Sequence, residues 1–192
     1  MVKIAVTGKA NTGKNTLSKM LKKELTSYKV DTLAFADPIK EMIRIMFPDF
    51  PKKYLYGPSS FRNEIIPGAF KNGNPLTVRQ LLIDIGTGMG RGYKESIWLD
   101  NFDIRFKKSL KNNKHVIVTD VRFRNEFDHL KNHNFYMIKL HRNNNGPIIN
   151  HASETNQESI LDKEFDYIID NNGSLKSLQL KVDEIILQLK NK

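Results

Sequence analysis

The sequence predicts an α/β fold built on a parallel sheet of about five strands. Five short runs are apolar nearly throughout rather than alternating, as expected of strands that are covered on both faces. Helical patterns separate most of them, and this alternation favours a three-layer α/β/α arrangement. The apolar runs are KIAVTG (3–8), DTLAFA (31–36), HVIVTD (115–120), FYMIKL (135–140) and FDYIID (165–170). The helical patterns cover 15–25, 38–46, 78–85, 96–110, 125–131 and 174–189.

Two irregular stretches interrupt this alternation within what we expect to be a single domain, 1–192. The stretch from about 47 to 94 has no strong strand pattern and carries Pro/Gly clusters such as YGPSS and KNGNP. We interpret it as part of a loop-and-helix insertion at about 47–100. The segment HRNNNGPIINHASE follows the fourth strand and predicts a functional loop at about 142–156.

The composition bounds the class of protein. The chain has 192 residues, 39% of them hydrophobic, and no cysteine, which excludes disulfides and thiolate metal sites. Its formal charge of +10 indicates anionic partners, although a solvated cationic surface explains the charge as well as a nucleic-acid patch or a field that steers phosphates does. The first apolar run is too short for a signal peptide and no stretch could span a bilayer, so we expect a cytoplasmic protein without a membrane partner.

The segment TGKANTGKNTL, residues 7–17, joins the first strand to the first helix. Gly8 and Gly13 frame four residues, and Lys14 follows at once. In a strand–loop–helix context this spacing predicts a P-loop, whose backbone N–H groups surround a phosphate at the positive end of a helix. Lys14 would then reach the β- and γ-phosphates. The alternative is a glycine-rich turn that merely precedes a lysine.

The residue after the lysine departs from the common P-loop pattern. A hydroxyl that holds magnesium usually stands there, but here Asn15 comes first and Thr16 follows. GKNT resembles the GK-x-T form of small-molecule monophosphate kinases. That resemblance implies that Thr16 binds nucleotide phosphates and that Asn15 faces an acceptor substrate. No NKxD guanine-recognition motif follows, which argues against a GTPase.

Two further segments carry candidate substrate-binding residues. In FADPIK, Asp37 either caps the next helix or contacts substrate, and Lys40 reads as solvated rather than catalytic. In TVRQLLIDIGTGMGR, Thr77 is expected to cap a helix that ends at the glycines. Arg79 lies in the first turn of that helix, where a cation opposes the helix dipole unless an anion faces it. Arg91 could reach the same neighbourhood, and Trp98, the only tryptophan, is expected in the core.

The segment HVIVTDVRFRNEFDHL places Asp120 at the carboxyl end of a buried strand, the ligand-binding edge of a parallel sheet. Asp120 could order magnesium waters, and Arg122 could hold a phosphate with two parallel hydrogen bonds. The alternative is a surface ion pair between Asp120 and Arg122 that contributes under ~1 kcal/mol.

Taken together, GKANTGKNT, FADPIK, RQLLIDIGTGMGR…IW, TDVRFRNE and HASE occur in the order found in bacteriophage deoxynucleoside monophosphate kinases. The chain is similar to this family along nearly its whole length. The resemblance implies the nucleoside-monophosphate-kinase fold, with ATP and Mg²⁺ as cofactors, a deoxynucleoside monophosphate as acceptor, and host cytoplasm as the location if the source is viral. It is compatible with a homodimer and implies no stable nucleic-acid partner.

The resemblance also implies roles for individual residues, with an acceptor-binding insertion at about 47–100 and a lid at about 142–156. Lys14, Asp120 and Arg122 would be catalytic. Thr16 and Asp120 would bind the metal ion. The residues expected to bind ATP are Gly8, Ala10, Asn11, Thr12, Gly13, Lys14, Asn15, Thr16 and Arg142. Those expected to bind the acceptor are Asn15, Asp37, Lys40, Arg79, Gly86, Thr87, Arg91, Trp98, Arg122 and Glu126.

The chain departs from the family pattern at two positions. Asn15 stands where the family often has aspartate, and Ile83 stands where it commonly has glutamine. In the lid, His151 either pairs with Glu154 or caps the next segment.

Two other functions fit some of the same residues. Animal-type phosphomevalonate kinase shares a similar P-loop and DVR block. Its acceptor has no nucleotide base, so its pocket needs no aromatic side chain for a base to stack on. A nucleic-acid-binding ATPase fits the charge, but the chain has no second ATPase motif set and no aromatic-rich strand of RNA-binding type.

Overall fold

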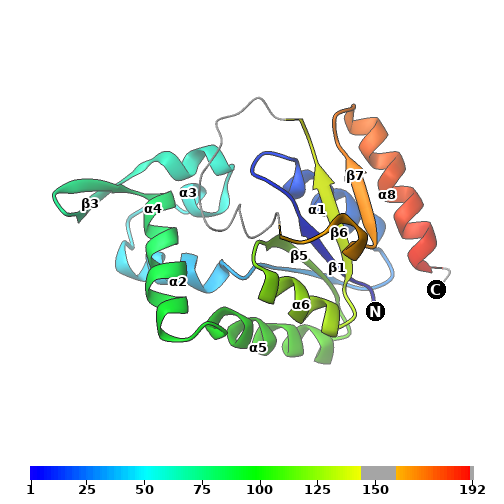
Figure 1. Cartoon of the computed structure of the whole chain (residues 1–192), viewed down its shortest axis with the longest axis horizontal. Helices are drawn as coiled ribbons and strands as arrows, with labels where there is room; N and C mark the ends of the chain where they lie inside the picture. The colour runs from blue at the N-terminus through cyan, green and yellow to red at the C-terminus, as the bar shows by residue number, and fades with distance from the viewer. Residues whose placement is uncertain (144–158, 191–192) are drawn as a thin grey trace. The chain divides into compact units, whose positions relative to one another are not determined.

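The computed structural model describes residues 1–143 and 159–190 (Figure 1). Within them the chain divides into two compact units. The first unit comprises Met1–Ala34 and Asp103–Lys192, and the second comprises Phe35–Phe102. The lid predicted at about 142–156 lies outside the described residues except for its start at Arg142 and Asn143, and so do His151 and Glu154.

The first unit is built on a five-stranded sheet in the order β2-β5-β1-β6-β7, and every pairing in it is parallel. The strands therefore confirm the predicted α/β class. β2 and β5 lie on one side of β1 in the sheet, and β6 and β7 lie on its other side. The order of the strands therefore changes direction at β1. In parallel sheets ligands bind at such a point, outside the carboxyl ends of the strands. The strands are β1 (Lys3–Thr7), β2 (Val30–Leu33), β5 (His115–Val121), β6 (Tyr136–His141) and β7 (Tyr167–Asp170).

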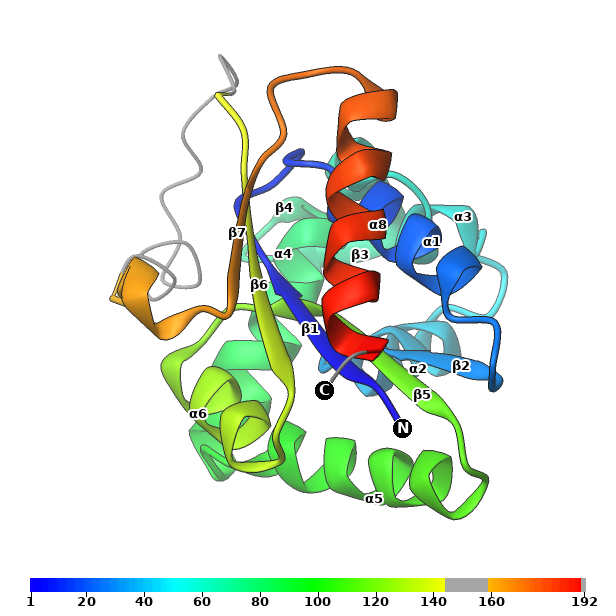
Figure 2. The same ribbon diagram turned by 90° about the vertical axis from the view of Figure 1, so that its right-hand side faces the viewer.

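One face of this sheet is covered by α1 (Lys14–Glu24) and α8 (Leu175–Lys190), which lie side by side (Figure 2). Ile4 and Val6 of β1 point into this layer because alternate residues of a strand face the same side. Leu17 and Leu21, four residues apart on α1, meet them. The rest of this core consists of Leu25, Ile117, Ile138, Leu140, Ile169, Leu178, Val182, Ile185, Ile186 and Leu189.

A second layer contains α6 (Arg124–Asn132) and the part of α5 (Ile97–Lys111) that belongs to the first unit. Phe106 of α5 packs on Phe135, with ring centroids 5.2 Å apart. Phe127 and Leu130 of α6 are buried completely or nearly so. The 3₁₀ turn η3 (Asp162–Glu164) precedes β7.

The second unit is mostly helical. Its elements are α2 (Asp37–Met46), α3 (Lys53–Tyr56), the 3₁₀ helix η1 (Ser59–Asn63), β3 (Ile65–Lys71), β4 (Asn74–Thr77), α4 (Val78–Ile83), the π-helix η2 (Asp84–Arg91) and the start of α5. Thr77 caps α4 as predicted, because its Oγ1 accepts a hydrogen bond from the N–H of Gln80 at 3.2 Å.

The absence of a strand between 47 and 94 was a wrong prediction. β3 and β4 pair as an antiparallel hairpin. Asn72 and Gly73 form its turn with φ values of 52° and 78°, a combination that suits an Asn-Gly hairpin turn. Pro67 and Pro75 hide the strand pattern, and they are tolerated because a two-stranded sheet has only edge strands.

The predicted end of the helix at the glycines of IGTG was also wrong. The helical path continues from α4 into η2 and reaches Arg91, and Gly86 is not in the left-handed conformation of a C-terminal cap. The second strand is shorter than the DTLAFA run predicted, since β2 ends at Leu33. Among the described residues, no helix is both long and apolar enough to cross a membrane.

Candidate active site

The carboxyl ends of four neighbouring strands form the candidate site in the first unit. Thr7 at the end of β1 pairs with Val121 at the end of β5, and its Oγ1 donates to the Val121 carbonyl at 3.0 Å. His141 at the end of β6 pairs with Asp170 at the end of β7. The segments that follow or include these ends carry the P-loop, Asp120 with Arg122, Arg142 and Asn171. The structure therefore brings the sequence-predicted P-loop, Asp120, Arg122 and Arg142 to one edge of the sheet, together with Asn171, which was not predicted.

The P-loop has the backbone that its glycines predict. Gly8 and Gly13 have φ values of 150° and 101°, which side chains rarely adopt. A Cβ at Gly8 would lie 2.4 Å from the carbonyl oxygen of Leu140, so the loop start approaches β6 too closely for any other residue. Asn11 is also left-handed, with φ of 62°, and Thr12 Oγ1 donates to the carbonyl of Lys9 at 2.9 Å.

Lys14 is the first residue of α1, directly after the loop. Its Nζ donates to the carbonyl oxygens of Gly8 and Lys9 at 2.5 and 2.6 Å. The ammonium group is thus folded over the loop that precedes it. These two backbone acceptors hold its positive charge over the loop.

Asn171 supports the P-loop from the last strand, and the sequence analysis missed it. It follows β7 directly and is 8% exposed. Its Nδ2 donates to the carbonyl of Thr12 at 2.8 Å, and its own N–H donates to the carbonyl of His141 at 2.8 Å. A Cβ at Gly13 would lie 2.6 Å from the same Nδ2. The only sequence signal was a run of polar residues, DNNGS, immediately after the fifth apolar run.

Asp120 and Arg122 lie on either side of Val121, the last residue of β5, and both are partly buried. Glu126 is 3% exposed and lies in the first turn of α6. Its Oε2 accepts the backbone N–H groups of Arg122 and Phe123 at 2.8 and 3.1 Å. These bonds satisfy donors at the helix start and fix the backbone that carries Arg122.

The remaining candidates of this edge are more accessible. Asn15 and Arg142 are exposed, and Thr16 is partly buried in the first turn of α1. A hydroxyl near the N-terminus of a helix that follows a P-loop is suited to bind a phosphate or a hydrated cation.

In the second unit, Arg79 lies at the start of α4 and bonds to the neighbouring 3₁₀ helix η1. Its Nε donates to Asn63 Oδ1 at 3.2 Å, and one of its terminal nitrogens donates to the carbonyl of Ser59 at 3.4 Å. These contacts orient the guanidinium group. Arg91, at the end of η2, donates to the carbonyl of Glu95 at 3.4 Å.

Trp98 organises the glycine-rich helix rather than lying open as a stacking surface. The residue is 6% exposed, and its Nε1 donates to the carbonyl of Gly86 at 2.7 Å. A Cβ at Gly90 would lie 2.2 Å from Cζ2 of the indole. The tryptophan therefore lies in the core, as predicted. The π-helix η2, which includes Thr87, is hydrogen-bonded to the indole through Gly86. π-Helical turns of this kind are frequent at functional sites.

Lys40 differs from its predicted solvated state. It is 9% exposed, its Nζ lies 3.4 Å from Asp37 Oδ1, and the same atom lies 5.1 Å from the ring centroid of Tyr56. Asp37 is itself the first residue of α2. Burial, together with a hydrogen bond to Glu41, raises the pKa of Tyr56 to about 12, so this phenol stays neutral beside Lys40. Lys40 lies in a packed, partly aromatic environment.

Comparison with known proteins identifies the family. The family model described as deoxynucleotide monophosphate kinase matches residues 52–182, more than half of the chain. A protein of Acanthamoeba polyphaga mimivirus described as "Putative deoxynucleotide monophosphate kinase" is 27% identical over 197 aligned positions, which cover 95% of this chain and 94% of the relative. This relative comes from a mimivirus and not from a bacteriophage.

Two solved structures share the fold at low identity. TT1252 from Thermus thermophilus is 14% identical with a TM-score of 0.53, over 98% of this chain and 97% of that one. Dephospho-CoA kinase from Campylobacter jejuni is 14% identical with a TM-score of 0.52, over 97% and 96% of the two chains. These likenesses support the α/β kinase fold.

Proposed function

The chain belongs to the deoxynucleotide monophosphate kinase family, and on this basis we propose that it transfers the γ-phosphoryl group of ATP to a deoxynucleoside 5′-monophosphate. The observation that carries the proposal is the P-loop of the first unit, with Lys14 folded over it, at the same sheet edge as Asp120 and Arg122. Such a reaction needs mainly positioning and charge neutralisation, which we assign to Lys14, Asp120 and Arg122.

The donor phosphates are proposed to bind the backbone N–H groups of the loop from Gly8 to Lys14. Lys14 would exchange its two backbone acceptors for β- and γ-phosphate oxygens, which are stronger acceptors because they are charged. Arg142 is proposed to cover the nucleotide from the end of β6. The family membership makes ATP the expected co-substrate.

Mg²⁺ is the cation expected with ATP, and we propose that Thr16 and Asp120 hold it. The donor set fits, because Mg²⁺ prefers oxygen ligands and keeps several waters, so that one hydroxyl and one carboxylate suffice beside the phosphates. When bound, Mg²⁺ supplies neutralisation of charge on the β- and γ-phosphates.

In the proposed reaction an oxygen of the acceptor monophosphate forms a bond to the γ-phosphorus. The bond between that phosphorus and the β–γ bridging oxygen breaks, and ADP leaves with the electron pair. The acceptor oxygen is already anionic, so no general base is required. We propose that Arg122 orients the acceptor phosphate, on a backbone that Glu126 holds in place.

Asn15, in the P-loop segment of the first unit, is one proposed contact of the acceptor, and the second unit carries other residues proposed for acceptor binding. Arg79, Thr87 and Arg91 offer polar groups for the phosphate or the sugar, whereas Gly86 and Trp98 shape the helix that carries Thr87. Asp37 and Lys40 remain proposed contacts of the acceptor. The segment 47–100 is the proposed acceptor-binding insertion.

The positive charge is proposed to attract these small phosphates rather than a polymer. We therefore expect no stable nucleic-acid complex at about 150 mM salt, where exposed charges more than about 8 Å apart are screened. A homodimer and a cytoplasmic location remain predictions.

The test is a coupled ADP-release assay with ATP over all deoxy- and ribonucleoside monophosphates, and with phosphomevalonate. We expect turnover with at least one deoxynucleotide and a weaker response to its ribose counterpart. Lys14→Ala should keep the fold and lower kcat/KM by at least ~10²-fold, because its charge meets developing phosphate charge. Activity with phosphomevalonate alone would overturn the acceptor, and normal turnover by folded Lys14→Ala would remove the P-loop from the mechanism.

A further inference from the structure

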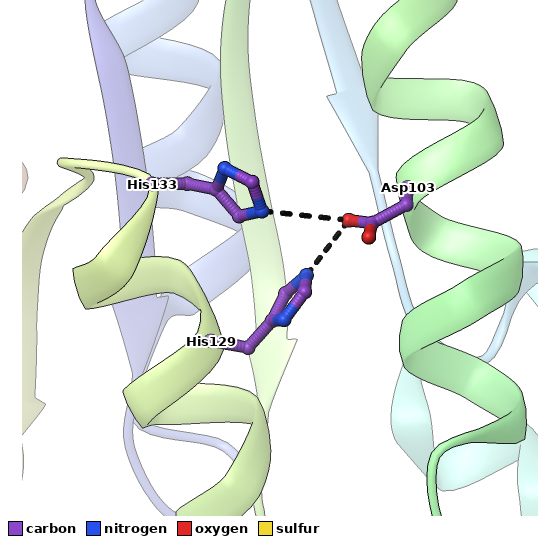
Figure 3. A group of neighbouring side chains, drawn as sticks. All are labelled: Asp103, His129 and His133. Carbon is purple, nitrogen blue, oxygen red and sulfur yellow. Dashed lines mark hydrogen bonds and ion pairs between the residues drawn. The ribbon is translucent and has the colours of Figure 1, made fainter.

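Two histidines and an aspartate converge in the first unit (Figure 3). His129 lies in α6 and His133 directly after it, so the four-residue spacing puts both rings on one side of the helix. Asp103 reaches them from α5. Asp103 Oδ1 lies 2.7 Å from Nε2 of His129 and 3.6 Å from Nε2 of His133.

These three side chains are the kinds that bind zinc-like ions. Zn²⁺ takes imidazole nitrogen and carboxylate oxygen at roughly 2.0–2.2 Å, and open sites use three protein ligands with water in the fourth position. Ligand atoms arranged tetrahedrally at that distance are roughly 3.3–3.6 Å apart. The three ligand atoms here lie within 4.8 Å of one another. The 3.6 Å contact between Asp103 and His133 matches the tetrahedral spacing, and the 2.7 Å contact between Asp103 and His129 is shorter. An ion would be accommodated if the contact between Asp103 and His129 widened by roughly 0.6–0.9 Å.

The surroundings hold His133 in position and favour its neutral form, which a metal requires. Its ring packs edge-on against Phe106 at 5.3 Å and against His129 at 4.7 Å. Burial lowers the pKa of His133, the neighbouring His129 lowers it further, Asp103 raises it, and Lys3 and Lys107 lower it. The two lysines oppose a bound dication, whereas the Asp103 carboxylate attracts it.

The place of the cluster in the fold separates it from the phosphate chemistry. His133 precedes β6, at the amino end of that strand, whereas the P-loop follows the carboxyl end of β1. β1 and β6 are parallel neighbours, so the two features lie at opposite edges of the sheet. An ion at the cluster would link α5 to α6 and would not touch the transferred phosphate.

We propose that Asp103, His129 and His133 bind one divalent transition-metal ion of the zinc class, which ties α5 to α6. Such an ion binds the folded chain and not the unfolded one, so it raises the stability of the first unit. The rival explanation is a plain hydrogen bond between Asp103 and the histidines that links the two helices without a metal.

The experiment uses the full chain without a polyhistidine tag, treated with a chelator and kept free of nucleotide. Calorimetric titration with Zn²⁺ should give one ion per chain with a Kd in the micromolar range or below, and Zn²⁺ should raise the unfolding temperature. His129→Gln and Asp103→Asn should each weaken binding at least tenfold. His141→Gln is the matched control, because His141 is exposed on β6 and outside the cluster, and it should bind as the parent does.

A second readout avoids variants altogether. In the unmodified protein, imidazole resonances of His129 and His133 should shift on adding Zn²⁺ and stay unchanged on adding Mg²⁺, which prefers oxygen ligands. Co²⁺ should give the visible absorption of a four-coordinate ion with nitrogen and oxygen ligands, since the chain has no cysteine. The proposal is overturned if Zn²⁺ leaves these resonances unchanged, or if His129→Gln and His141→Gln bind Zn²⁺ equally well.

Discussion

Replacing Asn171 by aspartate should impair ATP use through the P-loop, although Asn171 lies 159 residues from its partner Thr12 along the chain. The substitution keeps the size of the side chain and exchanges an N–H donor for an acceptor. A carboxylate oxygen would then face the Thr12 carbonyl at the 2.8 Å that now separates donor and acceptor. Two acceptors at this distance repel, and the loop must shift or the carboxylate must take up a proton.

The expected loss of kcat/KM for ATP follows from the burial of the Thr12 carbonyl. Thr12 is 2% exposed, so its carbonyl finds no replacement by water without movement of the loop. Leaving a buried acceptor unsatisfied costs about 1–3 kcal/mol. If this free-energy cost falls entirely on the conformation of the loop that binds phosphate, kcat/KM for ATP falls by about 5- to 150-fold, because each factor of ten corresponds to about 1.36 kcal/mol.

The assay is steady-state kcat/KM for ATP, together with calorimetric binding of a non-hydrolysable ATP analogue as a readout that does not depend on turnover. The control is Asn172→Asp, which adds the same negative charge one residue further on at an exposed position. We expect Asn171→Asp to weaken analogue binding and Asn172→Asp to change it by less than twofold. Equal effects of the two substitutions, or a folded Asn171→Asp protein with unchanged analogue affinity, would refute the role of Asn171 as support of the loop.

Two further predictions concern the acceptor side and the glycine-rich helix. Arg122→Lys should raise the acceptor KM and lower kcat, because an ammonium group cannot make two parallel hydrogen bonds to a phosphate; unchanged constants would make the residue a surface partner of Asp120. Gly90→Ala should lower the free energy of unfolding in urea by about 1–3 kcal/mol, because its Cβ would lie 2.2 Å from Trp98. Gly88→Ala is the control, since nothing lies within 4 Å of the added atom, and a loss as large as that of Gly90→Ala would show that Trp98 is not the cause.

The P-loop backbone of the candidate site was predictable because its signals are local. Gly8, Gly13 and Lys14 lie within seven residues, and their spacing alone fixes a loop between a strand and a helix. Asp120 was found for a related reason: the end of an apolar strand marks the ligand-binding edge of a parallel sheet. In both cases the backbone geometry follows from neighbours in the sequence.

The second unit was harder to predict because its strands and helices break the usual patterns. Pro67 and Pro75 lie inside strands, which sequence rules forbid except at edges, and the Asn72-Gly73 pair was the signal that could have revealed the hairpin. From the local sequence, the glycines of η2 predict the end of a helix. In the structure the helical path continues through them, and Trp98 packs against it. The indole hydrogen bond to Gly86 is a contact across twelve residues, and it has no signature in the local sequence.

Lys40 shows the same limit for a charged side chain. Its neighbours in the sequence suggest a solvated residue, but Tyr56, sixteen positions away, provides a ring beside its ammonium group. Lysine buries its methylene chain readily while the charge finds a partner, so its exposure depends on the packing of α2 and α3. Sequence spacing carries no information about that packing.

Asn171 shows why a P-loop needs support from outside its own motif. Gly8, Asn11 and Gly13 all adopt positive φ values, and a chain segment with two glycines loses more conformational entropy on ordering than one without. The loop's own hydrogen bonds, such as Thr12 Oγ1 to Lys9, close it locally but do not attach it to the sheet. The attachment comes from β6, through the close approach of Gly8 to Leu140, and from Asn171 after β7. If ATP binds this loop as proposed, a loop that is already ordered loses less conformational entropy on binding, so less of the binding energy is spent on ordering it.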